Sequence, residues 1–232
     1  PKYGEYIRRI IMFYVDNYDS FENHSTHCGR GKIQADNLGE AWFICAIEKV
    51  LRMVSDLDIF DDDDIEYIGE HFFRPEAALI KPQIRSIHNI HVTMISSIAA
   101  CANILQDKEM LNEAIHGNLG FFDQLYRGVR KDGFWYEISD SYHSLTLNSL
   151  LAIAFIAKEN GIDVFKDPIF EKMGTVYSRL AYEDGLIPAY NDGWYGHHIY
   201  DYDYQFEQLA SIYDTQEKKF YSRILNYCYT LK

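Results

Sequence analysis

Apolar residues recur at three- and four-residue spacing along most of the chain, which is the pattern of amphipathic helices. The clearest example is the series Ile87, Ile90, Met94, Ile98 and Leu105. Strand signals are thin and confined to two short stretches, so the predicted fold class is all-α with few or no strands. The predicted helices cover residues 3–18, 38–57, 61–80, 86–106, 108–130, 139–160, 168–182, 204–213 and 216–231.

Two of the predicted helices carry clear local signals at their ends. Four aspartates at residues 61–64 begin the third helix, where the positive end of the helix dipole favours acidic side chains. Ser139 is a good N-cap for the sixth helix and Gly161 supplies its stop. This sixth helix is apolar nearly all round, so we expect it to be buried on all sides.

The order of the helices predicts a partial toroid. Successive helices follow one another at roughly 20–25 residues through short turns, as in stacked antiparallel helical hairpins. We therefore expect one domain over residues 1–232, an incomplete (α/α) toroid. Residues 133–138 and 185–190 are the only stretches that could hold short extended pieces.

Composition narrows the classes of function. The 232 residues include 22 Lys and Arg against 35 Asp and Glu, a net charge of −13. This acidity argues against nucleic acid or a membrane as partner, because phosphate groups attract a basic surface. Aromatic residues make up 16% of the chain. They fit either a large core or a surface on which flat rings stack against sugars.

The cysteines and histidines do not form a metal-binding pattern. The four cysteines are widely spaced without a CxxC pair, so no disulfide framework is implied. His24, His27 and Cys28 have the density of metal ligands, but no fourth ligand follows at a suitable spacing. A polar loop is the favoured interpretation, and we expect neither a metal nor another cofactor in this chain.

Polar side chains gather at the N-terminal ends of two apolar helices, in residues 85–91 and 132–143. If alternate helices run parallel around a toroid, these two ends lie on one face. His88, Asn89 and Tyr142 would then share one cleft. An amide such as Asn89 could bind a substrate carboxylate there, or could make an ordinary polar contact between helices.

Tyr142 is the most reactive candidate by position. It occupies the third position of a helix capped by Ser139, where free amides and the helix dipole favour negative charge. A cationic His88 or Arg85 nearby would lower its pKa further and allow it to act as a general base and then a general acid. The alternative is a packed tyrosine whose hydroxyl reaches water.

A turn-rich loop at residues 185–198 carries Tyr190, Asn191 and Trp194 among other aromatic residues. Loops of this kind line binding sites because rigid helices hold them in place. A rigid connector with aromatic packing is the alternative.

Together these segments resemble the helical toroid domain of the heparinase II/III-like polysaccharide lyases, which include related alginate and oligo-alginate lyases. The most specific run is Asp-Gly-Phe-Trp-Tyr-Glu-Ile-Ser-Asp-Ser-Tyr-His at residues 132–143, and the Ile-Pro-Ala-Tyr-Asn-Asp run at 187–192 supports it. The other residues that carry the resemblance are His88, Asn89, Asp107 and residues 117–121.

The resemblance implies β-elimination on a uronic-acid polysaccharide that is heparin-like, heparan-sulfate-like or alginate-like. By position, Tyr142 would be the catalytic tyrosine, and His88 or Asn89 would neutralise the uronate carboxylate. It also favours a periplasmic or secreted location over the bacterial cytoplasm. The side chains expected to contact the acidic polysaccharide or oligosaccharide are Arg85, His91, Trp135, Glu137, His143, Tyr190, Asn191 and Trp194.

The chain departs from that family in length. Its members carry a β-sandwich domain after the toroid, which adds a histidine and in some cases a structural metal. No β-rich region is visible here, so we expect a fragment or a reduced homologue that can be inactive alone, with a downstream β-sandwich of the same parent chain as a partner.

Two other functions stay open on the sequence. A glycoside hydrolase would need two carboxylates about 5–10 Å apart, for which Glu137, Asp140 and Asp192 are candidates. A non-catalytic carbohydrate-binding or assembly module is the other open function.

Overall fold

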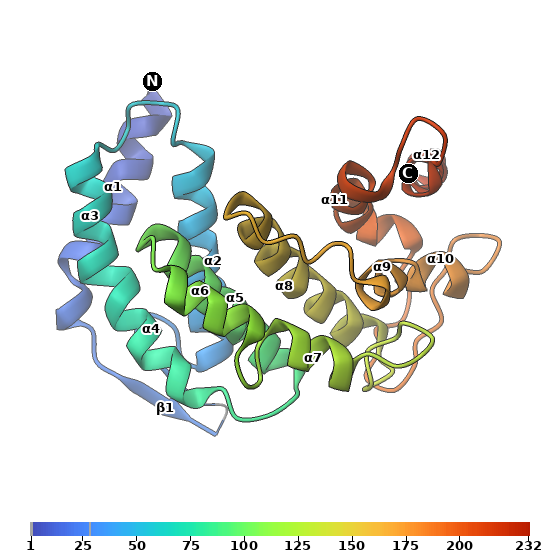
Figure 1. Cartoon of the computed structure of the whole chain (residues 1–232), viewed down its shortest axis with the longest axis horizontal. Coiled ribbons are helices and arrows are strands. Elements are labelled where there is room, and N and C mark those ends of the chain that lie inside the picture. Colours follow the sequence, from blue (N-terminus) through green and yellow to red (C-terminus); the bar gives the residue numbers. More distant parts are fainter. Residues whose placement is uncertain (1, 28) are drawn as a thin grey trace. The chain divides into compact units, whose positions relative to one another are not determined.

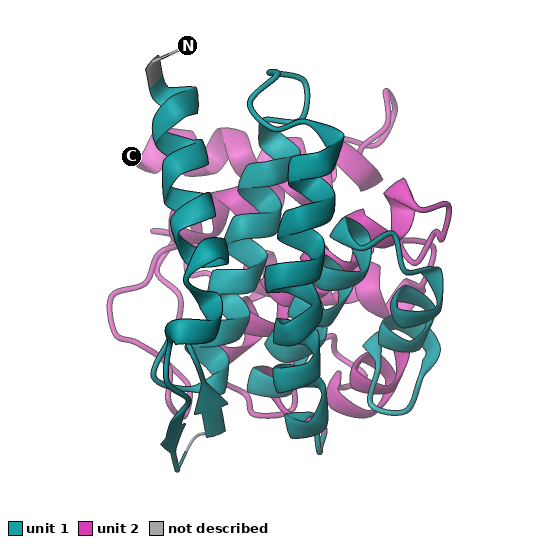
Figure 2. Ribbon diagram, turned by 90° about the vertical axis from the view of Figure 1, so that its left-hand side faces the viewer, with its two compact units in different colours: residues 1–86, 90–121 teal, residues 87–89, 122–232 magenta. Residues whose placement is uncertain are grey.

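The computed structural model describes residues 2–27 and 29–232, and most of these residues are helical. This confirms the predicted mostly-α fold. The only sheet in the described part of the chain is a two-stranded antiparallel hairpin. The chain divides into two compact units, shown in two colours in Figure 2. Unit 1 contains Pro1–Ser86 and Ile90–Phe121, and unit 2 contains Ile87–Asn89 and Phe122–Lys232. The expected single toroid domain stays a prediction.

Unit 1 contains the first six α-helices and the hairpin. Within this unit α2 packs against α4, and α1 packs against the π-helical turn Gly69–Phe73 (Figure 1). The first residue of α5, Asn89, belongs to unit 2. The elements are α1 (Lys2–Asp16), β1 (His24–Thr26), β2 (Gly29–Gly31), α2 (Asn37–Met53), α3 (Asp62–Ile68), α4 (Arg74–Ile80), α5 (Asn89–Ile104) and α6 (Lys108–His116).

The predicted helix over residues 61–80 begins as expected but is interrupted. Asp61 and Asp64 form a reciprocal capping box at its start, and Arg8 forms an ion pair with Asp64. The π-helical turn Gly69–Phe73 then divides the helix into α3 and α4. Residues 72 and 73 of this turn are both buried phenylalanines, so the bulge directs two adjacent aromatic rings into the core.

The polar loop predicted between α1 and α2 contains the hairpin instead. Its exit is held by the buried carboxylate of Glu40, which accepts hydrogen bonds from the backbone N–H groups of residues 32, 33 and 34. Glu76 is also buried in this unit, and neither of its oxygens has a hydrogen-bond partner among the described residues. Burial, with Glu40 nearby, raises the pKa of Glu76 to about 10, so its carboxyl group is protonated at neutral pH.

Unit 2 is built around α8, which is buried along most of its length as predicted. Ser139 caps this helix by accepting a hydrogen bond from the backbone N–H of Tyr142. Within this unit α11 packs against α8, α9 and α12. The helices are α7 (Phe121–Gly128), whose first residue belongs to unit 1, α8 (Asp140–Glu159), α9 (Pro168–Gly174), α10 (Val176–Leu180), α11 (Asp203–Tyr213) and α12 (Phe220–Leu231).

Two of the predicted long helices are each divided into two shorter helices in the structure. The helix predicted over residues 108–130 is α6 and α7, separated at Gly117–Gly120 where α6 ends. The helix predicted over 168–182 breaks at Thr175 into α9 and α10. The two predicted extended pieces are only isolated bridges, Val129 with Trp135 and Leu186 with His198.

No described helix is both long enough and apolar enough to span a bilayer. Of the cysteines, Cys45, Cys101 and Cys228 are free, and Cys28 lies outside the described residues. In the described ranges, no group of three or more His, Cys, Asp or Glu side chains could hold a metal ion. The last residue of the predicted ligand-like group, Cys28 after His24 and His27, lies outside the described residues.

Candidate functional site

Glu137 joins three sequence motifs within unit 2. Its Oε2 atom accepts hydrogen bonds from Asn89 Nδ2 and from Trp135 Nε1, each at 2.6 Å. Its backbone carbonyl accepts a third hydrogen bond from Asn191 Nδ2 at 2.8 Å. The start of α5, the segment before α8 and the aromatic loop thus meet at one residue.

The backbone around Glu137 is held in an unusual conformation. Ile138, the next residue, has a φ of 51°, in the left-handed region that a β-branched side chain rarely adopts. Such a residue costs about 1–3 kcal/mol and persists where its surroundings determine it. Here the N–H of Ile138 donates to the Trp135 carbonyl at 3.0 Å, and Ser139 begins α8 directly afterwards. This turn directs the Glu137 side chain toward Asn89.

Trp135 and His143 support this turn from inside the core. Both are fully buried, so the expectation that they contact a substrate does not fit their position. His143 Nδ1 accepts from the backbone N–H of Trp135 at 3.1 Å, and its Nε2 lies 3.2 Å from the Met173 carbonyl. Burial lowers the pKa of His143 to about 3, so the imidazole is neutral, and these two partners assign its proton to Nε2.

The environment of Tyr142 differs from the prediction. Its hydroxyl donates to Asp192 Oδ2 at 3.1 Å, although the two residues are far apart in sequence. This hydrogen bond, with partial burial and the charges of Asp192 and Glu137, raises the pKa of Tyr142 above its ordinary value. The expected lowering by a cationic neighbour is therefore wrong, and the phenol is protonated at neutral pH.

Tyr142 lines an open pocket of about 520 Å³ in unit 2. The aromatic loop supplies the other walls, which include Asn191, Asp192, Trp194 and Tyr195. Trp194 is 68% exposed and Tyr195 is 95% exposed, and Tyr190 of the same loop is also exposed. Exposed flat rings beside polar groups are suited to bind an amphipathic ligand such as a sugar.

The buried carboxylate of Asp140, which the sequence suggested only as a hydrolase candidate, fixes this loop. Asp140 Oδ2 lies 3.0 Å from His197 Nδ1 and accepts a hydrogen bond of 3.0 Å from the Tyr202 hydroxyl. The ring of Trp194 stacks on His197. Gly193 leaves room for Asp140, because a Cβ at this position would lie 2.1 Å from Asp140 Oδ1. In the sequence, Gly193 after Asp192 was the signal that a side chain packs closely against this loop.

The predicted site residues near the start of α5 belong to different units. Asn89 is buried, whereas His88 is half-buried and its backbone N–H donates to Gln124 Oε1 at 3.2 Å. Arg85 and His91 belong to unit 1 and line a different pocket there. The structure therefore connects Asn89 to the Tyr142 pocket through Glu137 and Asn191.

Replacing Glu137 with Ala is expected to lower the free energy of unfolding by about 1–3 kcal/mol, because the Asn89 and Trp135 donors lose their shared acceptor. Urea denaturation followed by tryptophan fluorescence measures the change. The matched control is Glu183→Ala, which removes an exposed carboxylate and should change stability by less than about 0.5 kcal/mol. Equal stability of the two variants would contradict the assigned network.

Residues 116–221 match the family model of the heparinase II/III N-terminus. This segment contains the turn at Glu137 and Ile138, the aromatic loop and α8. The match supports the heparinase II/III-like family that the motifs predict, and it relates the chain to the polysaccharide lyases. No curated protein matches the chain.

Proposed function

We propose that this chain is the toroid part of a polysaccharide lyase that cleaves a uronic-acid polysaccharide by β-elimination. The observation that carries the proposal is the protonated Tyr142 hydroxyl in an open pocket beside exposed aromatic rings, within the segment that matches the heparinase II/III N-terminus. The substrate would be an acidic polymer of heparin, heparan sulfate or alginate type, which favours a periplasmic or secreted location.

The reaction needs three groups around the sugar. One group neutralises the uronate carboxylate and so acidifies the C5 proton, and a base then removes that proton. The C4–C5 double bond forms as the C4–O4 bond breaks, and the leaving O4 takes up a proton. No oxidant or reductant takes part, because one proton leaves carbon and one arrives at oxygen.

The raised pKa of Tyr142 is consistent with a role as the acid in this scheme. A tyrosine whose pKa is raised holds its proton at neutral pH, so Tyr142 is suited to protonate the leaving O4. A substrate hydroxyl or O4 would replace Asp192 as its hydrogen-bond partner. Of the two candidates for the carboxylate neutraliser, His88 is partly exposed, whereas Asn89 is 3% exposed and donates to Glu137. We assign direct contact to His88 and positioning to Asn89.

The test is to incubate the full chain with heparan sulfate, hyaluronan and alginate and to follow ultraviolet absorbance. An unsaturated uronate absorbs, so absorbance that rises with time on one of these polymers is the expected result. New reducing ends without absorbance would overturn the lyase in favour of a hydrolase. Retention of a polymer with neither product, also after addition of a family β-sandwich domain, would favour a binding module.

A further inference from the structure

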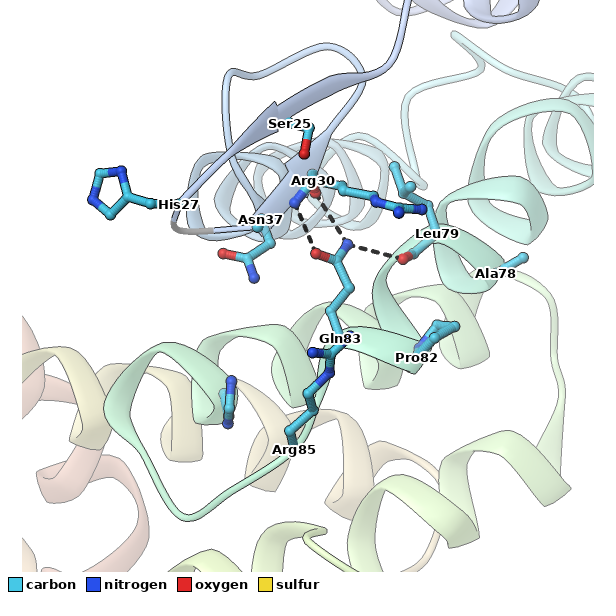
Figure 3. A pocket seen from close by; sticks show the side chains of 11 residues that line it. Ser25, His27, Arg30, Asn37, Ala78, Leu79, Pro82, Gln83 and Arg85 are labelled. Carbon is cyan, nitrogen blue, oxygen red and sulfur yellow. Dashed lines mark hydrogen bonds between the residues drawn. The ribbon is translucent and has the colours of Figure 1, made fainter.

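A second pocket lies in unit 1, outside the segment that matches the heparinase II/III N-terminus. Its volume is about 470 Å³, and the hairpin, the start of α2 and the end of α4 form its walls (Figure 3). Arg30 and Arg85 line this pocket together with the imidazoles of His27 and His91. None of the described side chains that line it is acidic, in a chain whose net charge is −13.

The two arginines are available to an anion. Both are exposed, and within the described ranges neither guanidinium forms an ion pair. Guanidinium groups bind the oxygens of carboxylates and sulfates through parallel N–H donors. A pocket that keeps two of them away from carboxylates in an acidic protein therefore favours an oxyanion as its occupant.

The pocket wall is fixed by one amide side chain. Gln83 Oε1 accepts from the Arg30 N–H at 2.8 Å, and Gln83 Nε2 donates to the carbonyls of Arg30 and Leu79 at 3.0 Å (Figure 3). Gly29, with a φ of 118°, brings the hairpin close to α2, since a Cβ there would lie 2.3 Å from Asn37 Nδ2. The position of Arg30 is thus set before any ligand arrives.

Asn37 provides an independent sign of a ligand. It lines the pocket and is only 5% exposed, yet its Oδ1 atom has no hydrogen-bond partner in the described part of the chain. A buried acceptor without a partner costs about 1–3 kcal/mol. An O–H or N–H donor from a ligand would satisfy it.

We propose that this pocket binds one acidic sugar unit. Arg30 and Arg85 would hold its carboxylate or sulfate, and Asn37 Oδ1 would accept from a hydroxyl of the same unit. The choice of a sugar as occupant rests on the proposed function, whereas the pairing of an oxyanion with a hydroxyl donor comes from the pocket alone. The site would hold a part of the polymer that is not undergoing cleavage.

The test is titration calorimetry with the full chain, using single sugars that have no glycosidic bond to cleave. The probes are D-glucuronate, a sulfated glucosamine, D-glucose and inorganic sulfate. We expect binding of the two acidic sugars and none of glucose. Arg30→Gln with Arg85→Gln should raise their Kd about tenfold or more, a loss of about 1.4 kcal/mol. The control, Arg130→Gln with Lys131→Gln in unit 2, should leave Kd unchanged.

The role of Asn37 has a separate readout. Asn37→Ala should weaken D-glucuronate but leave inorganic sulfate unchanged, since sulfate donates no hydroxyl; circular dichroism checks that this variant folds. Unchanged Kd in the double arginine variant, or an equal loss in its control, would overturn the site. The calorimetry measures binding and does not depend on cleavage. A negative lyase assay would therefore contradict the proposed function without contradicting this binding site.

Discussion

Replacing Tyr142 with Phe is expected to lower kcat on a cleavable uronate polymer by about 10²–10⁴-fold, the range for loss of a general acid. The substitution removes one oxygen and keeps the ring, and the helix cap uses the backbone N–H of this residue rather than its hydroxyl. The protein should therefore fold as before. The initial rate of absorbance increase at saturating polymer measures the effect.

The matched control for this variant is Tyr182→Phe, which removes the hydroxyl of an exposed tyrosine in the same unit. It should keep the parent rate. If Tyr142→Phe also keeps that rate, the proposed acid is wrong, whatever reaction the protein performs.

The hydrogen bond from Tyr142 to Asp192 gives the same proposal a pH signature. Because this bond raises the pKa of Tyr142, Asp192→Asn should lower that pKa. A general acid works while it is protonated, so activity is lost as the pH rises through its pKa. The alkaline limb of the pH–rate profile should therefore move to lower pH in Asp192→Asn. If the alkaline limb does not move, Tyr142 is not the group whose titration limits the rate at high pH.

The second large effect is on stability and concerns Glu76. Its pKa is about 10 in the folded chain and 4.5 as the ordinary value, so the folded state holds a proton that the unfolded state releases. The stability from this proton is complete below pH 4.5 and is lost as the pH rises toward 10, by about 1.4 kcal/mol for each pH unit. Gln at this position has no proton to lose.

Glu76→Gln is therefore expected to make the chain more stable at pH 7 by up to about 3 kcal/mol, with a larger gain at pH 9 and little change at pH 4.5. Urea unfolding at the three pH values measures the difference. Glu66→Gln, at an exposed position of α3, is the control and should follow the parent at every pH. A parallel shift of both variants, or no pH dependence in the difference, would contradict a buried protonated Glu76.

The sequence predicted α8 over its whole length, because this helix has an apolar period, a cap and a stop. α8 begins at its Ser139 cap and ends before Gly161 as expected, because both signals are local. The hairpin escaped prediction because its strands have three residues each and depend on the buried Glu40, which lies outside them. The π-helical turn escaped for a similar reason, since the phenylalanine pair that it buries also fits a regular helix.

The sequence predicted which residues lie in the site better than it predicted what each residue does there. The motifs identified Asn89, Glu137 and Asn191, and the structure joins them through hydrogen bonds. The burial of Trp135 could not be predicted, because the left-handed Ile138 beside it breaks any period that tells inside from outside. The raised pKa of Tyr142 depends on Asp192, a partner from a distant loop that no local pattern reveals.

The path of the chain at Ile87–Asn89 has a practical consequence. These three residues belong to unit 2, although the chain before and after them belongs to unit 1. A fragment cut at the edges of the matched segment, residues 116–221, would keep Tyr142 and Glu137 but leave behind the Asn89 amide. It would also lose the Ile87 carbonyl that accepts from the Tyr136 hydroxyl. The site therefore extends beyond the matched segment, and a fragment that keeps it must begin at or before Ile87.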